Sequence, residues 1–95
     1  MYRRETSKLH AMARSPRFRV VVTDHAERRL LERDVSRFEA ERLVRAGVVV
    51  MVETDPGGGE RWRVAGRDTD GRQIEVEVEA VPPALVVLVT VVRVG

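Results

Sequence analysis

The second half of the chain constrains the fold most, because it alternates between short β-rich segments and turn-forming residues. The β-rich segments are VVVMVE at 48–53, ERWRVAGR at 60–67, QIEVEVEAV at 73–81 and LVVLVTVVRV at 85–94. Their β-branched residues favour strands, whereas the PGGG, TDG and PP sequences between them favour turns. We therefore expect a meander of four antiparallel strands. Because the last segment is apolar on both faces, it should be central in the sheet or covered on both sides.

The charges on the two middle segments indicate how they pair. If residues 69–71 form a three-residue loop with Gly71 in the left-handed bulge position, Arg63 lies opposite Glu77 and Arg61 lies opposite Glu79. The other face of this hairpin then carries the apolar residues Trp62, Val64, Ile74, Val76 and Val78. A two-residue loop would instead set arginine opposite valine. We therefore interpret both arginines as cross-strand partners of glutamates rather than as RNA contacts.

The first half predicts one strand and two short helices. FRVVVT at 18–23 has the alternation of a half-buried strand. Asp24 can cap a helix over about 25–33, and Ser36 with Glu39 forms a capping-box pattern for a second helix. Gly47 suits the left-handed residue that ends this second helix. The two helices and the sheet predict an α+β domain, with the helices packed on the sheet.

Length and charge indicate one domain with a basic N-terminal segment. The 95 residues are 43% hydrophobic and 34% charged, which is typical of a globular domain. The first 20 residues carry a net charge of roughly +5, although the whole chain carries +2. We divide the chain into a basic arm at 1–17 and a single domain at 18–95. The arm can bind a phosphate backbone or an acidic partner, or it can be a solvated, poorly ordered terminus.

The composition excludes several kinds of site. The chain has no cysteine, so it has no disulfide, thiolate nucleophile or cysteine-ligated zinc. Its two histidines, His10 and His25, are not at a metal-ligand spacing, and we expect no metal and no cofactor. No segment is long and apolar enough to cross a membrane or to act as a signal peptide, so we expect a cytoplasmic protein with no membrane partner.

Three residues of the first predicted helix are candidates for chemistry. His25, Arg29 and Arg33 follow one another at intervals of four, so they lie along one side of that helix, at the edge of its apolar stripe. Imidazole exchanges protons near neutral pH, and guanidinium groups stabilise charge on a phosphate. The alternative is structural, because a histidine at a helix start can simply bond to its neighbours and the arginines can form a solvated face.

Thr90 is the other candidate, because its hydroxyl lies within the apolar run LVVLVTVVRV. It is either hydrogen-bonded within the sheet or directed into a cleft. The sequence leaves both interpretations open.

These residues lie in segments that resemble a bacterial family, domain of unknown function 4258. The motif TDHAERRLLERDVSRFEAERLVRAG is similar to the opening of that family, which typically reads Thr-x-His-Ala-x-x-Arg-Met-x-x-Arg-Gly-Ile-Ser. The matches are His25, Ala26, Arg29, Arg33 and Ser36. The later hairpin and the final strand resemble the family more loosely, since Val92 stands where an aromatic residue is usual and Asp34 stands where glycine is common. The resemblance covers about residues 18 to 94.

The family is similar to toxins of the RelE and BrnT type and to barnase-like nucleases. This resemblance implies two N-terminal helices on a four-stranded antiparallel sheet. It further implies a metal-independent endoribonuclease in which His25 is the general acid or base, Arg29 and Arg33 bind the phosphate, and Thr90 assists. A cognate antitoxin would be the partner beside RNA. The alternative is a non-catalytic protein-binding module on the same fold, and a homodimer is compatible with an exposed strand edge.

Overall fold

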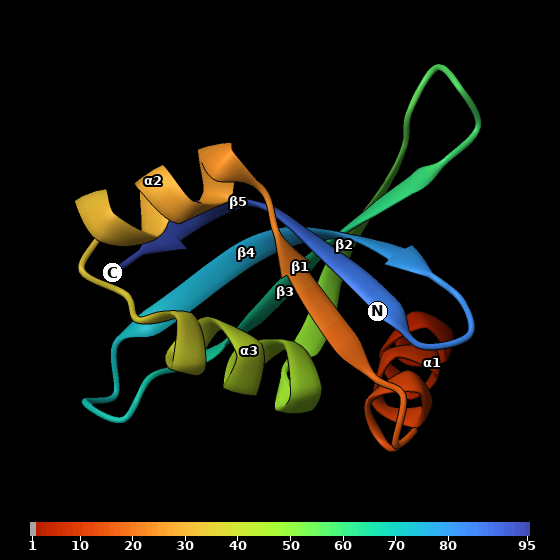
Figure 1. Cartoon of the computed structure of the whole chain (residues 1–95), viewed down its shortest axis with the longest axis horizontal. Helices are drawn as coiled ribbons and strands as arrows, with labels where there is room; N and C mark the ends of the chain where they lie inside the picture. The colour runs from red at the N-terminus through yellow and green to blue at the C-terminus, as the bar shows by residue number, and fades with distance from the viewer. Residues whose placement is uncertain (1) are drawn as a thin grey trace.

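The structure is a computed structural model that describes residues 2–95, apart from the side chain of residue 93. Within these residues, three helices and five strands follow one another in the order α1 (Arg3–Ala13), β1 (Arg19–Val22), α2 (Asp24–Glu32), α3 (Arg37–Ala46), β2 (Val48–Thr54), β3 (Glu60–Arg67), β4 (Gln73–Val81) and β5 (Leu85–Val94). The strands form one sheet in the order β1-β5-β4-β3-β2, with α2 and α3 over one face of it (Figure 1). The α+β class is thus confirmed. No helix in this part of the chain has the length and apolar character needed to span a membrane.

The expected sheet of four antiparallel strands was wrong in number and direction. The sheet is mixed, because β1 joins it as a fifth strand and pairs in parallel with β5, with Val20 opposite Val86. The other neighbouring strands are antiparallel and connected by short turns. The chain leaves β1 through two helices instead of a hairpin, and a long crossover of this kind permits parallel pairing with a distant strand.

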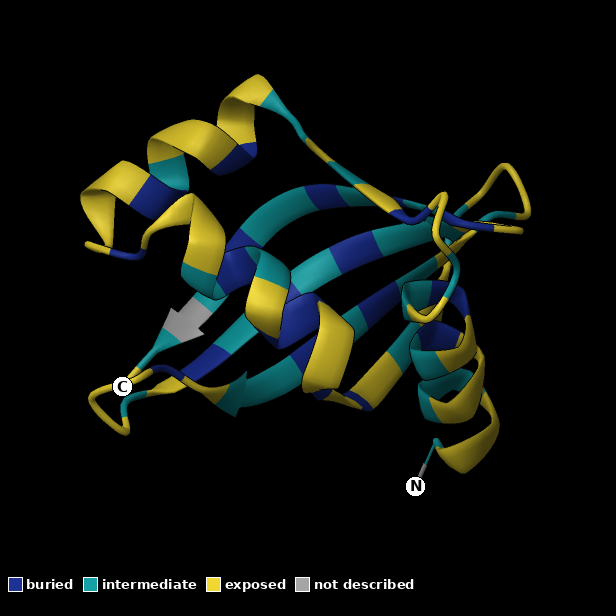
Figure 2. Ribbon diagram, turned by 60° about the horizontal axis from the view of Figure 1, so that its bottom comes forward, coloured by how far each residue is buried: buried dark blue, intermediate teal, exposed yellow. Residues whose placement is uncertain are grey.

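The core lies between the sheet and the helices. Figure 2 shows buried residues alternating with less buried ones along the strands, and buried positions on the sides of the helices that face the sheet. In β5, Val86, Leu88 and Val91 are buried, and the strand has β1 on one side and β4 on the other. We expected this strand to be central or covered on both sides; it is an internal strand, next to the edge strand β1, while β4 is the middle strand of the sheet.

The hairpin of β3 and β4 has the register that the charges predicted. Arg61 lies opposite Glu79 and Arg63 opposite Glu77, and Gly71 has a positive φ of 83°. The face expected to be apolar is buried, with Trp62, Val64, Ile74, Val76 and Val78 all in the core.

The ion pairs on the other face of this hairpin connect diagonal rather than opposite residues. The guanidinium of Arg61 lies 3.6 Å from Glu77, and that of Arg63 lies 3.9 Å from Glu75. Strand twist brings one set of diagonal neighbours within reach of long side chains, which accounts for the offset. The interpretation of both arginines as cross-strand partners of glutamates agrees with these contacts.

Of the two predicted helix starts, one differs from expectation and the other agrees with it. The N-cap of α2 is Thr23 and not Asp24, since the Thr23 hydroxyl accepts a hydrogen bond from the Ala26 amide at 3.1 Å. Ser36 caps α3 as predicted, and accepts from the Glu39 amide at 3.0 Å.

Gly47 ends α3 in extended backbone, with φ −75° and ψ 179°, and not in the left-handed conformation that we predicted. The chain passes directly from α3 into β2, so no left-handed reversal is needed. A Cβ atom at this position would lie 2.6 Å from Val64 Cγ1. The glycine is therefore required by close packing of the helix end on β3.

Residues in the expected basic arm form the helix α1, which packs against α3 and β2. Leu9 and Met12 are buried in the same core as the rest of the chain, so the alternative of a solvated terminus is wrong. The His10 ring donates from Nε2 to the Gly47 carbonyl at 2.8 Å, and the Val49 amide donates to the Thr6 hydroxyl at 2.9 Å. The helix thus satisfies polar groups at the start of β2. The division of the chain at residue 17 remains a prediction.

Arg72 connects the β3–β4 hairpin to the segment between α2 and α3. Its Nε donates to the buried Asp68 carboxylate at 2.7 Å, and its terminal nitrogens donate to the carbonyls of Arg33 and Asp34 at 3.4 and 2.8 Å. Burial by itself would raise the pKa of Asp68, but the hydrogen bonds from the Arg72 side chain and amide, with the Asp70 amide, lower it below 3.8. Asp34 has a positive φ of 55°, and Arg72 holds its carbonyl.

We predict that α1 is an integral part of the folded domain. Leu9 is fully buried, so Leu9→Ala should lower the free energy of unfolding by about 2–5 kcal/mol through lost burial and a residual cavity. Lys8→Ala, at an exposed position of the same helix, should change it by less than about 0.5 kcal/mol. Urea unfolding followed by circular dichroism measures both. Equal stability of the two variants would show that α1 does not pack on the core in solution.

We also predict that the Asp68–Arg72 pair stabilises the fold in a pH-dependent way. Because folding lowers the pKa of Asp68, its contribution is fully present above its ordinary pKa of 3.8 and is lost as the pH falls through the lowered value. Asp68→Asn should therefore be less stable than wild type at neutral pH and nearly equal to it well below pH 3.8. Urea unfolding across this range tests the prediction, with exposed Asp70→Asn as the matched control. A stability difference that stayed constant with pH would contradict it.

Candidate functional site

The site is positioned by Thr23, which attaches the start of α2 to β5. The Thr23 amide donates to the Leu88 carbonyl at 3.2 Å, and its hydroxyl lies 3.1 Å from that carbonyl and 3.2 Å from the carbonyl of Val89. The same hydroxyl oxygen accepts from the Ala26 amide and so caps the helix. One side chain therefore fixes both the helix start and its position over the last strand.

This attachment brings His25 next to Thr90. His25 follows Thr23 by two residues and Thr90 follows Leu88 by two, and the two side chains meet with His25 Nε2 3.1 Å from Thr90 Oγ1. His25 is exposed and Thr90 is half-buried, so the pair lies at the surface of the described chain. The Thr90 hydroxyl is thus hydrogen-bonded to a side chain of α2. From the sequence, we considered only a hydrogen bond within the sheet or a hydroxyl directed into a cleft.

Arg29 lies one helical turn beyond His25 on α2. Its side chain is 40% exposed and its Nη1 pairs with Glu32 Oε2 at 3.3 Å. An exposed pair of this kind contributes roughly 0.2–1 kcal/mol, so a phosphate can displace the carboxylate. Arg29 therefore lies on the same helix as His25, and its partner is an exposed carboxylate rather than a buried one.

Arg33 lies farther along, as the C-cap of α2, with φ −98° and ψ 2°. It is eight positions after His25, which corresponds to about 12 Å along the helix axis. Its carbonyl accepts from Arg72, which fixes the backbone, and its side chain is exposed. The structure thus joins His25 directly to Thr90 and places Arg29 and Arg33 on the same helix without contact to them.

The donor set of this site suits proton transfer and phosphate binding better than metal binding. Within residues 2–95, no cluster of three or more histidine, aspartate or glutamate side chains is arranged to hold a metal ion. An imidazole can exchange a proton, and guanidinium groups farther along the same helix can stabilise a phosphate anion.

Thr23 is the residue of this site that sequence reasoning missed. Thr23 and Asp24 are adjacent and both are good N-caps, so the capping pattern alone did not distinguish them. Its bonds to Leu88 and Val89 depend on the parallel pairing of β1 with β5, which no local pattern reveals.

Comparison with known proteins gives one match. The model of the family described as Domain of unknown function (DUF4258) matches residues 22–93. This range includes α2 with His25 and all of β5 except its last residue. No curated protein and no solved structure matches the chain. Because the match covers about three quarters of the sequence, the chain belongs to the family Domain of unknown function (DUF4258).

Proposed function

We propose that this protein is a metal-independent endoribonuclease of bacterial toxin type. The observation that carries the proposal is the 3.1 Å contact between His25 Nε2 and Thr90 Oγ1, because it orients an exposed imidazole on the same helix as two arginines. The RelE- and BrnT-like branch of the fold is part of the proposal and is supported by the resemblance of the sequence. A cognate antitoxin belongs to the same proposal on the same grounds.

The reaction requires one proton to be removed and one to be supplied. The RNA 2′-hydroxyl attacks the adjacent phosphorus, the bond from phosphorus to the 5′-oxygen breaks, and the products are a 2′,3′-cyclic phosphate and a 5′-hydroxyl. Thr90 engages Nε2 of His25, so Nδ1 is the ring nitrogen that takes the proton from the 2′-hydroxyl or gives one to the leaving 5′-oxygen, and solvent water carries out the other of these two transfers. Thr90 acts as a positioning residue for the imidazole.

The two arginines stabilise the phosphate in this scheme. Negative charge grows on the non-bridging oxygens during attack, and guanidinium groups bind such oxygens through charge-assisted hydrogen bonds. Arg29 is the nearer cation to His25, and Arg33 binds a neighbouring phosphate farther along the strand of RNA.

We predict that the purified protein cleaves a labelled RNA pool in the presence of a chelator. His25→Ala should lower the rate by about 100-fold or more, the usual contribution of a positioned acid or base. Arg29→Ala should also lower it, whereas Arg4→Ala, at an exposed position of α1, removes the same charge far from the site in sequence and should leave it unchanged. Mass spectrometry of the new ends should find the 2′,3′-cyclic phosphate.

Circular dichroism must show that each variant is folded. Cleavage that needs magnesium, or that continues at the same rate in His25→Ala, contradicts the proposed mechanism. Absence of cleavage by the folded wild-type protein would favour a non-catalytic binding module.

A further inference from the structure

One edge of the sheet is open along β1. The amides of Arg19 and Thr23 donate to the carbonyls of Ala84, just before β5, and of Leu88 in β5, and Val21 lies between them in the same register. In a parallel pair, alternate residues direct their backbone groups to the neighbouring strand. The amides and carbonyls of Val20 and Val22 therefore point away from β5, toward the outer edge.

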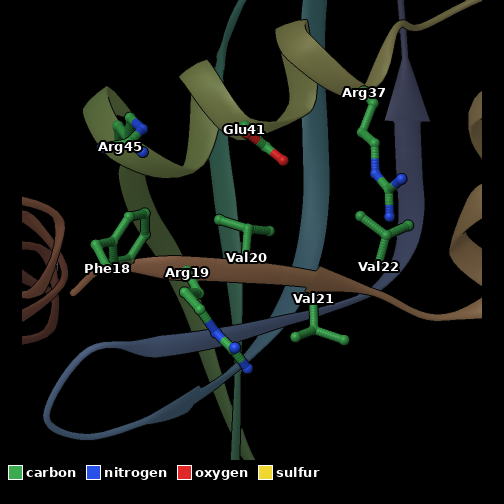
Figure 3. Close-up of a pocket in the computed structure, with 8 residues that line it drawn as sticks. All are labelled: Phe18, Arg19, Val20, Val21, Val22, Arg37, Glu41 and Arg45. Carbon is green, nitrogen blue, oxygen red and sulfur yellow. The ribbon is translucent and has the colours of Figure 1, made fainter.

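A groove runs along this edge between β1 and α3. Its volume is about 510 Å³, and its walls are residues 18–22 and one side of α3 (Figure 3). Consecutive residues of a strand point to opposite faces, so a hollow lined by five in a row lies along the strand edge and not on one face. In Figure 3, Val20 and Val22 point toward α3, whereas Arg19 and Val21 lie on the opposite side of β1. The groove therefore offers backbone hydrogen-bonding groups together with apolar side chains.

The charges around the groove are mainly positive. Arg37, Glu41 and Arg45 line it from α3 at intervals of four, and Arg19 lines it from β1. The Arg45 guanidinium lies 4.8 Å from the centre of the Phe18 ring, which fixes this cation at one end of the groove. Figure 3 shows Arg37 directed toward Val22 at the other end. With three arginines and one glutamate, the groove favours an acidic occupant.

We propose that an extended, acidic segment of a partner protein binds here as an added strand on β1. Its backbone would pair with Val20 and Val22, and carboxylates on its α3-facing side would lie beside Arg37 and Arg45. A segment of about four residues matches the length of β1. A second copy fits less well, because pairing β1 with β1 would bring the arginines of the two grooves together. This proposal does not depend on ribonuclease activity.

The test uses the full chain and a fluorescent peptide of about eight residues that alternates glutamate and valine. We expect this peptide to raise fluorescence anisotropy on binding, and a lysine–valine peptide of the same length not to bind. Amide hydrogen exchange by NMR should slow at Val20 and Val22. N-methylation of alternate peptide residues, on the side that pairs, should abolish binding because it removes the backbone donors.

The charge contribution is tested with a matched pair of variants. Arg37→Glu should weaken binding of the acidic peptide by roughly fivefold, and Arg4→Glu, an equal charge change on α1, should leave it unchanged. Equal binding of the lysine peptide would overturn the charge argument, and protection at β2 instead of β1 would overturn the location. Absence of binding at about 1 mM peptide, or self-association through β1 in sedimentation experiments, would overturn the proposed occupant.

Discussion

The parallel pairing of β1 with β5 determines how the rest of the molecule is arranged. The register of Val22 with Leu88 places Thr23 where its amide and hydroxyl meet the carbonyls of β5. Thr23 in turn starts α2, and the first turn of α2 carries His25 to Thr90. The same pairing turns the other edge of β1 outward, where it borders the groove under α3. Both the candidate catalytic pair and the candidate docking groove thus depend on one short strand of four residues.

Several arginines of this chain differ in their surroundings. Arg61, Arg63 and Arg72 have carboxylate partners that are partly or wholly buried, and they join strands or attach a hairpin to a helix linker. Arg33 and Arg37 are exposed near the candidate site and the groove. The net charge of +2 therefore does not describe the groove itself, which is lined by Arg19, Arg37 and Arg45 against a single carboxylate, Glu41.

Sequence patterns predicted local structure well and long-range structure poorly. The register of Arg63 with Glu77, the Ser36 cap and the internal position of β5 all follow from neighbouring residues or from hydrophobicity. The parallel pairing of the strand at 18–23 could not be predicted, because its sequence FRVVVT does not indicate which strand it pairs with. Helix α1 was missed because its apolar stripe is narrow, with Leu9 and Met12 among charged residues. For the site, the sequence singled out His25 and Thr90 separately, and only the strand pairing shows that they touch.

The contact between His25 and Thr90 joins residues that are 65 positions apart in the chain. Contacts between residues so far apart in the chain form slowly. The intervening chain must lose conformational entropy to close the loop before the contact contributes any stabilising free energy. During synthesis, α2 leaves the ribosome while β5 has not yet been made, so a nascent or truncated chain that lacks β5 has the histidine but not its hydroxyl partner. Formation of the candidate site is therefore coupled to completion of the fold, and a partially folded chain lacks the assembled site.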